Sequence, residues 1–155
     1  MVFGSKSPNK IAAAGTAANG VDTSAGITLE YGDSKLAVLA YNLQGETQEV
    51  TDVVGTKGRI RLQSPAHCPE RVTLMQAMGR GVYQTTNFTF PIPEPKGYPA
   101  PNWHYPNQHG FVYQARAVHR CVGAGWLECP QYSHDEVQKT MEIMDEAKRQ
   151  IMERR

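Results

Sequence analysis

The first ninety residues follow a strand pattern, in which short runs of β-branched, aromatic or alternating apolar residues are separated by turn residues. These runs predict strands at 10–17, 24–31, 35–43, 47–55, 59–63, 71–76 and 81–90. Glycine-containing turns lie between them, as at Asn19-Gly20 and Lys57-Gly58. Connections this short join antiparallel neighbours, because a parallel crossover needs a dozen residues or more. The pattern therefore predicts an open, mostly antiparallel sheet of six or seven strands.

The run at 35–43, KLAVLAYNL, is apolar on both faces. Alternation places Leu36 and Val38 on one side of the strand, and Leu39 and Tyr41 on the other. A strand of this kind must be covered on both faces. Two helices near the end of the chain suffice for one face, so we expect the other to meet something outside the chain. The pattern leaves open which face that is.

Helical periodicity begins after the proline-rich segment 91–110. Four apolar residues share one helix face: Phe111, Ala115, Val118 and Val122. The run Gly123-Ala124-Gly125 supplies the stop signal.

A second helix is predicted to open at Ser133, because Glu136 three residues later completes a capping box. Its apolar stripe is expected to pack in the core, with the two methionines as filler. The stripe comprises Val137, Met141, Met144 and Ile151. Sheet and helices together predict an α+β fold with helices packed on one face.

The amino-acid composition limits the class of protein further. The 155 residues are 40% hydrophobic and 20% charged, which suits a single domain over 1–155 with a real core. The formal net charge of +1 gives no overall field for nucleic acid or an acidic membrane. No run reaches the apolar length of a membrane span or a secretory signal. Three scattered cysteines are too few for a disulfide framework, so we expect a cytoplasmic protein with free thiols.

Residue patterns for catalysis or cofactor binding are weak. The segment Gly55-Thr56-Lys57-Gly58 lacks the order of a phosphate-binding loop and leads into another strand, so it is interpreted as a hairpin turn. His67 and Cys68 are adjacent in a strand-like segment and should point apart, which disfavours a thiol–imidazole couple. The spacing of Cys121 and Cys129 is too wide for the usual zinc pairs. By its residues alone, the chain is expected to hold no metal and no self-contained active site.

Three motifs taken together are more specific: GTKG at 55–58, the helix that carries Ala115, Val118 and Cys121, and MEIMDEAKRQI at 141–151. With them the chain resembles, over essentially its whole length, the C-terminal domain of the Gfo/Idh/MocA oxidoreductases. The resemblance implies an NADP-dependent enzyme whose glycine fingerprint, catalytic lysine and acid/base tyrosine precede this domain. None of those motifs occurs in this chain, so the resemblance assigns it no catalytic and no cofactor-binding residue.

The resemblance also implies a substrate pocket and a dimer surface. Pocket positions fall on His67, where relatives tend to carry tryptophan, and on Trp103 and Tyr105. A homodimer through the sheet is expected, with an interface drawn from Leu36, Val38, Leu39 and Tyr41.

Two functions remain open from the sequence. The chain is either the substrate-side and oligomerisation domain of an NADP-dependent oxidoreductase, acting on a dihydrodiol or a D-xylose-like sugar hydroxyl, or a stand-alone, non-catalytic binding or dimerisation module. Such a module would associate with itself or with a full-length relative.

Overall fold

The computed structural model describes residues 2–93 and 105–153. Within them lie seven strands, a short 3-10 helix and two α-helices. The chain divides into two compact units, Met1–Thr47 with Glu128–Arg155, and Gln48–Leu127. Each unit is described by itself.

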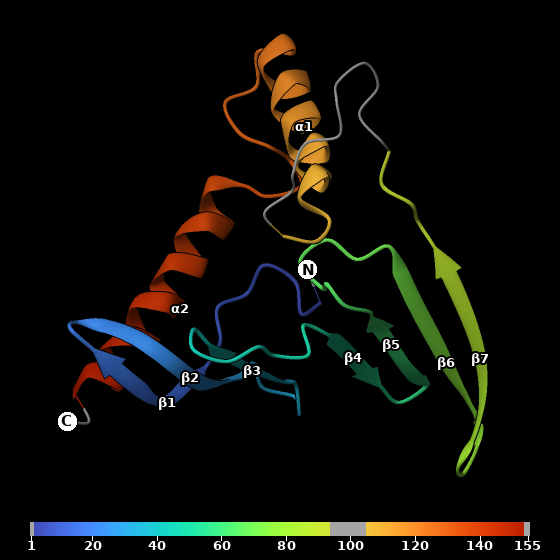
Figure 1. The fold of residues 1–155 in the computed structure, drawn as a ribbon, viewed down its shortest axis with the longest axis horizontal. Coiled ribbons are helices and arrows are strands. Elements are labelled where there is room, and N and C mark those ends of the chain that lie inside the picture. Colours follow the sequence, from blue (N-terminus) through green and yellow to red (C-terminus); the bar gives the residue numbers. More distant parts are fainter. Residues whose placement is uncertain (1, 94–104, 154–155) are drawn as a thin grey trace. The chain divides into compact units, whose positions relative to one another are not determined.

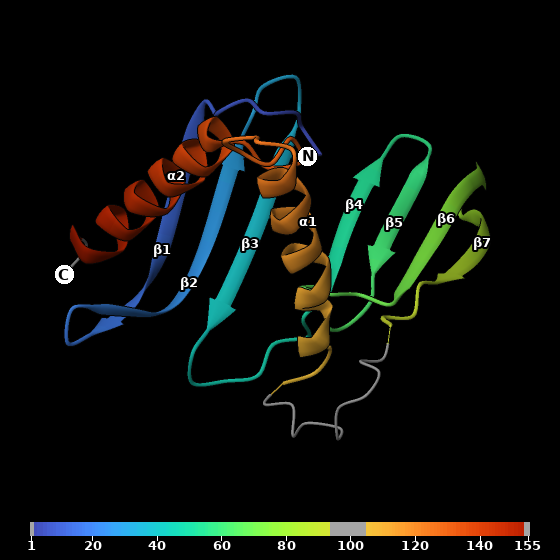
Figure 2. The same ribbon diagram turned by 90° about the horizontal axis from the view of Figure 1, so that it is seen from above.

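The first unit holds a three-stranded antiparallel sheet in the order β1-β2-β3. Its strands are β1 (Lys10–Ala18), β2 (Val21–Glu30) and β3 (Leu36–Asn42). Asn19 and Gly20 form the β1–β2 turn at φ of 53° and 80°, the left-handed conformation that such turns require. Helix α2 (His134–Glu153) lies along β1 and β2 (Figures 1 and 2).

Small side chains form the core between α2 and this sheet. The buried residues are Ala13, Ala25, Ala147 and Ile151, with 2–6% of their surface exposed. Gln150 joins the helix to the backbone of β1: the Ala13 N–H donates to its Oε1 at 2.8 Å, and its Nε2 donates to the Ile11 carbonyl at 2.9 Å. Gln150 thereby satisfies backbone groups of β1 that pair with no other strand in the described sheet.

The capping box that opens α2 is confirmed. Glu136 N–H donates to the Ser133 hydroxyl at 3.3 Å, and Ser133 N–H donates to the Glu136 carboxylate at 3.2 Å. Ser5 also donates to the Glu136 carboxylate, at 2.7 Å, which ties the N-terminal segment to the first turn of the helix.

The expected core stripe of α2 is wrong in all but one position. Ile151 is buried, but Val137, Met141 and Met144 are 39–56% exposed. The face that meets the sheet is instead rotated toward Ala147 and Gln150. The small Ala147 fits the alanine-rich surface of β1 and β2, which leaves no room for two methionines.

Strand register separates the two faces of β3. Tyr41 pairs with Ala25 and packs against the core cluster, so Tyr41 and Leu39 are on the side that α2 covers. Leu36 and Val38 lie on the opposite side and are 55% and 72% exposed. With Ala12, Ala14, Gly26, Thr28 and Ala40 they form what is called here the open face of the first sheet.

The second unit holds a four-stranded antiparallel sheet in the order β4-β5-β6-β7. Its strands are β4 (Thr51–Gly55), β5 (Gly58–Leu62), β6 (Arg71–Gly79) and β7 (Val82–Thr89). Gly55 pairs with Gly58, which confirms that the glycine–lysine segment is a hairpin turn. The α+β class and the antiparallel pairing are confirmed. The seven strands are divided between two sheets because the polar segment 43–50 forms no strand.

Helix α1 (Phe111–Gly123) follows the 3-10 turn η1 (Gln108–Gly110) and ends where the glycines predicted. Gly125 has φ 69° and its N–H donates to the Val122 carbonyl at 3.0 Å, so it supplies the left-handed C-terminal turn. Phe111, Val118 and Val122 share one face of α1 and are more than half exposed. Neither α-helix has the length and apolar character needed to cross a bilayer, as judged over the described residues.

Candidate substrate pocket

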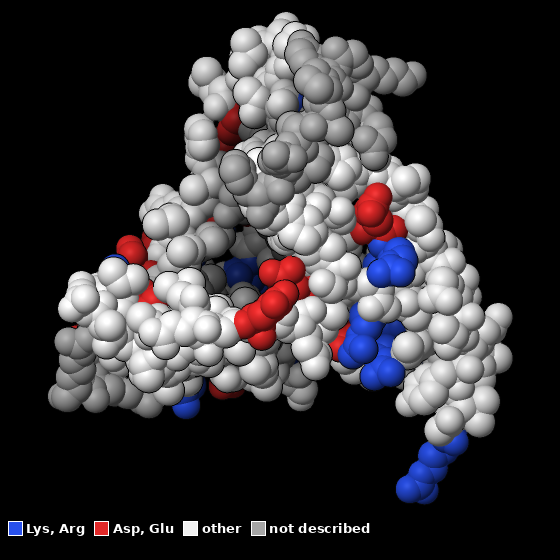
Figure 3. All heavy atoms as spheres, viewed as in Figure 1, with Lys and Arg blue, Asp and Glu red and all other residues white. Residues whose placement is uncertain are grey.

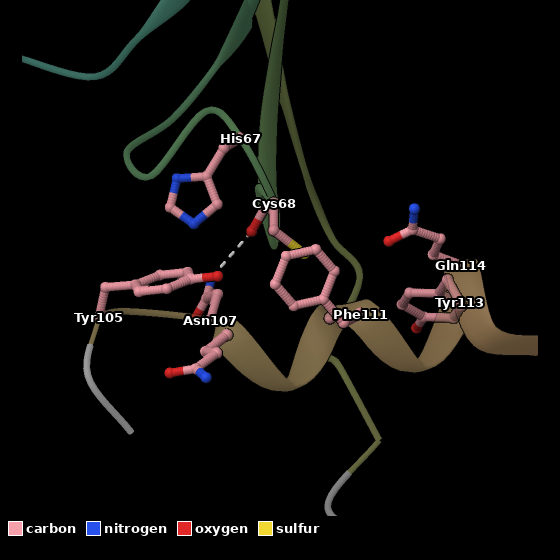
Figure 4. A pocket seen from close by; sticks show the side chains of 9 residues that line it. His67, Cys68, Tyr105, Asn107, Phe111, Tyr113 and Gln114 are labelled. Atoms are coloured by element: carbon pink, nitrogen blue, oxygen red, sulfur yellow. Dashed lines mark hydrogen bonds between the residues drawn. The ribbon is translucent and has the colours of Figure 1, made fainter. Parts of the chain in front are cut away.

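A hollow of about 340 Å³ lies within the second unit, where the loop after β5 meets the start of α1. The loop supplies His67 and Cys68, the segment before α1 supplies Tyr105 and Asn107, and the helix supplies Phe111 (Figure 4). Gln108, Gly110, Tyr113 and Gln114 complete the lining.

His67 and Tyr105 form one wall of this pocket. Their rings meet edge to face, with centroids 5.6 Å apart and an interplanar angle of 72°. The His67 Nε2 lies 3.1 Å from the Pro106 carbonyl oxygen. A carbonyl only accepts, so Nε2 carries the proton and the ring is held as the Nε2–H tautomer when it is neutral. This bond orders the backbone beside Tyr105.

Asn107 and Gly110 fix the other wall against Cys68. Asn107 has φ 59°, and its Nδ2 donates to the Cys68 carbonyl at 2.9 Å, the bond drawn in Figure 4. A Cβ on Gly110 would lie 2.2 Å from the Cys68 sulfur, so glycine at this position leaves room for the Cys68 side chain. Ile92, which is 7% exposed, packs behind the same point.

The lining favours a neutral ligand with polar groups and an apolar face. Among the lining residues that the structure describes, there is no Asp, Glu, Lys or Arg. Aromatic rings offer flat contact surfaces, and the side-chain amides of Gln108 and Gln114 can both donate and accept hydrogen bonds. Across the described residues, no group of three or more His, Cys, Asp or Glu is placed to hold a metal ion. The arrangement is therefore suited to binding and orienting a hydroxylated ligand.

Two of the three pocket residues expected from the sequence lie together here, namely His67 and Tyr105. Trp103 is outside the described residues. His67 and Cys68 both line the pocket but have different contacts, since the His67 ring meets Tyr105 whereas the Cys68 sulfur abuts Gly110. Sequence reasoning missed Asn107 and Gly110, although the Asn-x-x-Gly spacing before a helix was a usable signal for a tight turn.

Comparison with characterised proteins gives a consistent result. The chain is 33% identical over 156 residues to the trans-1,2-dihydrobenzene-1,2-diol dehydrogenase of Danio rerio, 27% identical over 153 residues to that of Homo sapiens, and 26% identical over 152 residues to that of Sus scrofa. Each match covers 97% of this chain. The chain is therefore similar, along nearly its whole length, to part of a dihydrodiol dehydrogenase. No family model matches it.

The chain spans 42% of the length of each of these dihydrodiol dehydrogenases. Together with the α+β fold, the match agrees with the C-terminal domain of the Gfo/Idh/MocA oxidoreductases. The chain is therefore an oxidoreductase-related domain. It corresponds to less than half the length of a dihydrodiol dehydrogenase.

Proposed function

We propose that this chain is the substrate-side and oligomerisation domain of an NADP-dependent oxidoreductase that acts on a dihydrodiol or a D-xylose-like sugar hydroxyl. The observation that carries the proposal is the pocket beside α1, which joins aromatic surfaces to amide groups and lies in a chain matched along 97% of its length by dihydrodiol dehydrogenases.

The pocket chemistry suits both substrate classes. A ring or sugar carbon skeleton would stack on Tyr105 and Phe111, while a hydroxyl would bond to the Gln114 amide. The proposal gives these residues the tasks of binding and orientation. Hydride transfer to NADP and proton transfer are assigned to a Rossmann domain of the kind that the family carries.

The oligomerisation role rests on the open face of the first sheet. Val38 is 72% exposed there and has small neighbours on β1 and β2, which gives a flat surface for close sheet-to-sheet packing. We propose a homodimer through this face, with Leu36 and Val38 in the interface. Leu39 and Tyr41 are on the side that α2 covers, so the alternative face is disfavoured.

A chimera tests the catalytic proposal. The segment of the Danio rerio relative that matches this chain is replaced by this chain, and NADP-dependent oxidation of trans-1,2-dihydrobenzene-1,2-diol and D-xylose is measured. We expect turnover of at least one substrate. The chimera with His67→Ala should show a raised KM, because the wall that holds Tyr105 is lost. The chimera with His119→Ala, a histidine on α1 that is not part of the pocket lining, should keep the parent KM.

The alternative function is a stand-alone, non-catalytic binding or dimerisation module. A folded chimera that binds NADP but oxidises neither substrate, combined with tight association between this chain and an intact relative, would favour that alternative.

A further inference from the structure

One face of the second sheet concentrates positive charge. Strand register brings Arg59 and Arg61 of β5 to the same side as Arg71 of β6. This surface, called the arginine face, also contains Asp52, Val54, Gln63, Thr73, Met75, Tyr83 and Asn87. Figure 3 shows blue side chains grouped over β5 and β6, with red carboxylate side chains beside them.

Within the described residues only Arg61 of the three arginines is ion-paired, and the same Asp52 carboxylate attracts Arg59 at longer range. Asp52 binds Arg61 in a fork, with Nε to Oδ1 at 2.8 Å and Nη2 to Oδ2 at 2.6 Å. Arg59 donates to the sulfur of Met75 at 2.9 Å, and a thioether is a weak acceptor. No carboxylate of the described chain lies within 4 Å of the Arg59 or Arg71 guanidinium. Two guanidinium groups therefore keep most of their donors for a partner.

The surface between the arginines is ordered. Gln63 donates to the Thr73 hydroxyl at 3.1 Å, and Thr73 donates to Asn87 at 2.9 Å, which links the loop after β5 to β6 and β7. Thr73 is only 7% exposed. At the margins lie Tyr83 and Val54, which are 58% and 76% exposed. Arginine, tyrosine and methionine around an ordered polar centre are typical of protein interfaces.

The positive charge of the arginine face favours a negatively charged partner. Packing this face on its own two-fold copy would oppose unpaired arginines, so like-charge repulsion disfavours a second copy. Arg59 pairs with Met75, and Arg71 lies four residues from Met75 along β6. The Arg59 and Arg71 Cα atoms are therefore separated by about 14 Å, from four strand rises and one inter-strand step. Carboxylates four residues apart in an extended peptide have about the same spacing, roughly 13 Å. Asp52 already shows the fork geometry that such a carboxylate would adopt.

We propose that the arginine face binds an acidic polypeptide segment in extended conformation, with carboxylates four residues apart that pair with Arg59 and Arg71. This interaction is separate from the substrate pocket and goes beyond the proposed oxidoreductase function.

Fluorescence anisotropy with the full chain tests this. The probe is a short labelled peptide of alternating Glu and Thr, and the reference peptide has Gln in place of Glu. We expect binding of the Glu peptide that weakens as salt rises, and binding of the Gln peptide that is at least about tenfold weaker. The double variant Arg59→Gln/Arg71→Gln should weaken binding of the Glu peptide by about tenfold or more.

A charge-matched control separates the site from general attraction. The double variant Lys57→Gln/Arg80→Gln removes two exposed positive charges from the hairpin turns and leaves the arginine face intact. It should bind within about twofold of the parent, and thermal melts establish that both variants are folded. Equal losses in the two variants would overturn the proposal. Tighter binding of a single-stranded DNA oligonucleotide than of the Glu peptide would also overturn it. So would self-association of the parent chain that is lost in the Arg59→Gln/Arg71→Gln variant and kept in the control variant.

Discussion

Gly58 is the position where a single added methyl group should cost the most. It opens β5 at φ 136°, a backbone conformation that residues with a side chain rarely adopt. A Cβ built there would lie 2.0 Å from the Met75 carbonyl oxygen and 3.1 Å from the Gln76 Cα, both in the backbone of β6. The obstacle is the neighbouring strand itself, which cannot turn aside as a flexible side chain would.

Two contributions set the magnitude for Gly58→Ala. Holding alanine at this φ costs about 1–3 kcal/mol. Relieving the contact requires β5 and β6 to separate locally, which weakens about two ladder hydrogen bonds at roughly 0.5–1.5 kcal/mol each. We therefore expect the free energy of unfolding to fall by about 2–6 kcal/mol, a large fraction of the ~5–15 kcal/mol typical of a domain.

A series of glycine variants separates the two contributions. Gly81→Ala tests the conformation alone, because Gly81 has φ 75° and a Cβ added there would meet nothing within 4 Å. Gly55→Ala is the control for both the conformation and the contact. Its φ is ordinary, and a Cβ there would be no closer than 4.0 Å to the Gly58 carbonyl oxygen. Urea unfolding followed by circular dichroism should rank the losses Gly58 > Gly81 > Gly55. If Gly58→Ala cost no more than Gly81→Ala, the reasoning from the β6 contact would be refuted.

The remaining predictions concern the helix cap, the Tyr41–Asp22 pair, the dimer interface and the cofactor. Ser133→Ala should lower the free energy of unfolding by about 0.5–2 kcal/mol, measured by urea unfolding, because the capping box is lost; an unchanged midpoint would contradict it. The Tyr41 hydroxyl donates to Asp22 and holds the pKa of that carboxyl below its usual value, while burial and this bond raise the pKa of Tyr41 to about 12. The stability that Asp22 contributes should be present above the ordinary carboxyl pKa and should be lost as pH falls through the lowered pKa. The stability that Tyr41 contributes should be present below pH ~10 and should be lost as pH rises toward its raised pKa. In Tyr41→Phe, the free energy of unfolding should therefore depend less on pH at both the acidic and the alkaline ends of the curve. If neither end changes, the Tyr41–Asp22 pair is not the source of that pH dependence. Val38→Lys should convert a homodimer to monomer in light scattering, since an unpaired charge would be buried in the interface; a parent chain that is monomeric at high concentration would sink the dimer proposal. Titration calorimetry should detect no micromolar binding of NADP to this chain, because the sequence has no glycine fingerprint at a strand-to-helix turn.

Much of the local structure could be predicted from the sequence. The strand runs were found within a few residues of their true bounds, because alternation and turn residues act over short distances. Asn19-Gly20 and Gly55–Gly58 specified hairpins for the same reason. Ser133 and Glu136 marked the start of α2, since a capping box is closed by residues three apart. The family resemblance, rather than any local pattern, grouped His67 with Tyr105, and both line one hollow in the structure; their role in substrate binding stays a prediction.

Tertiary structure alone decided which faces are buried and what meets in the pocket. The apolar stripe of α2 allowed several rotations, and the alanines of β1 and β2 selected the one that buries Ala147. The contact between Gly110 and Cys68 joins residues far apart in sequence, and neither has a local signal for the other. The arginine face likewise arises only from the register of β5 with β6. A single chain sequence encodes short-range preference directly, whereas helix rotation, strand register and long-range contact follow from the packing of all the elements at once.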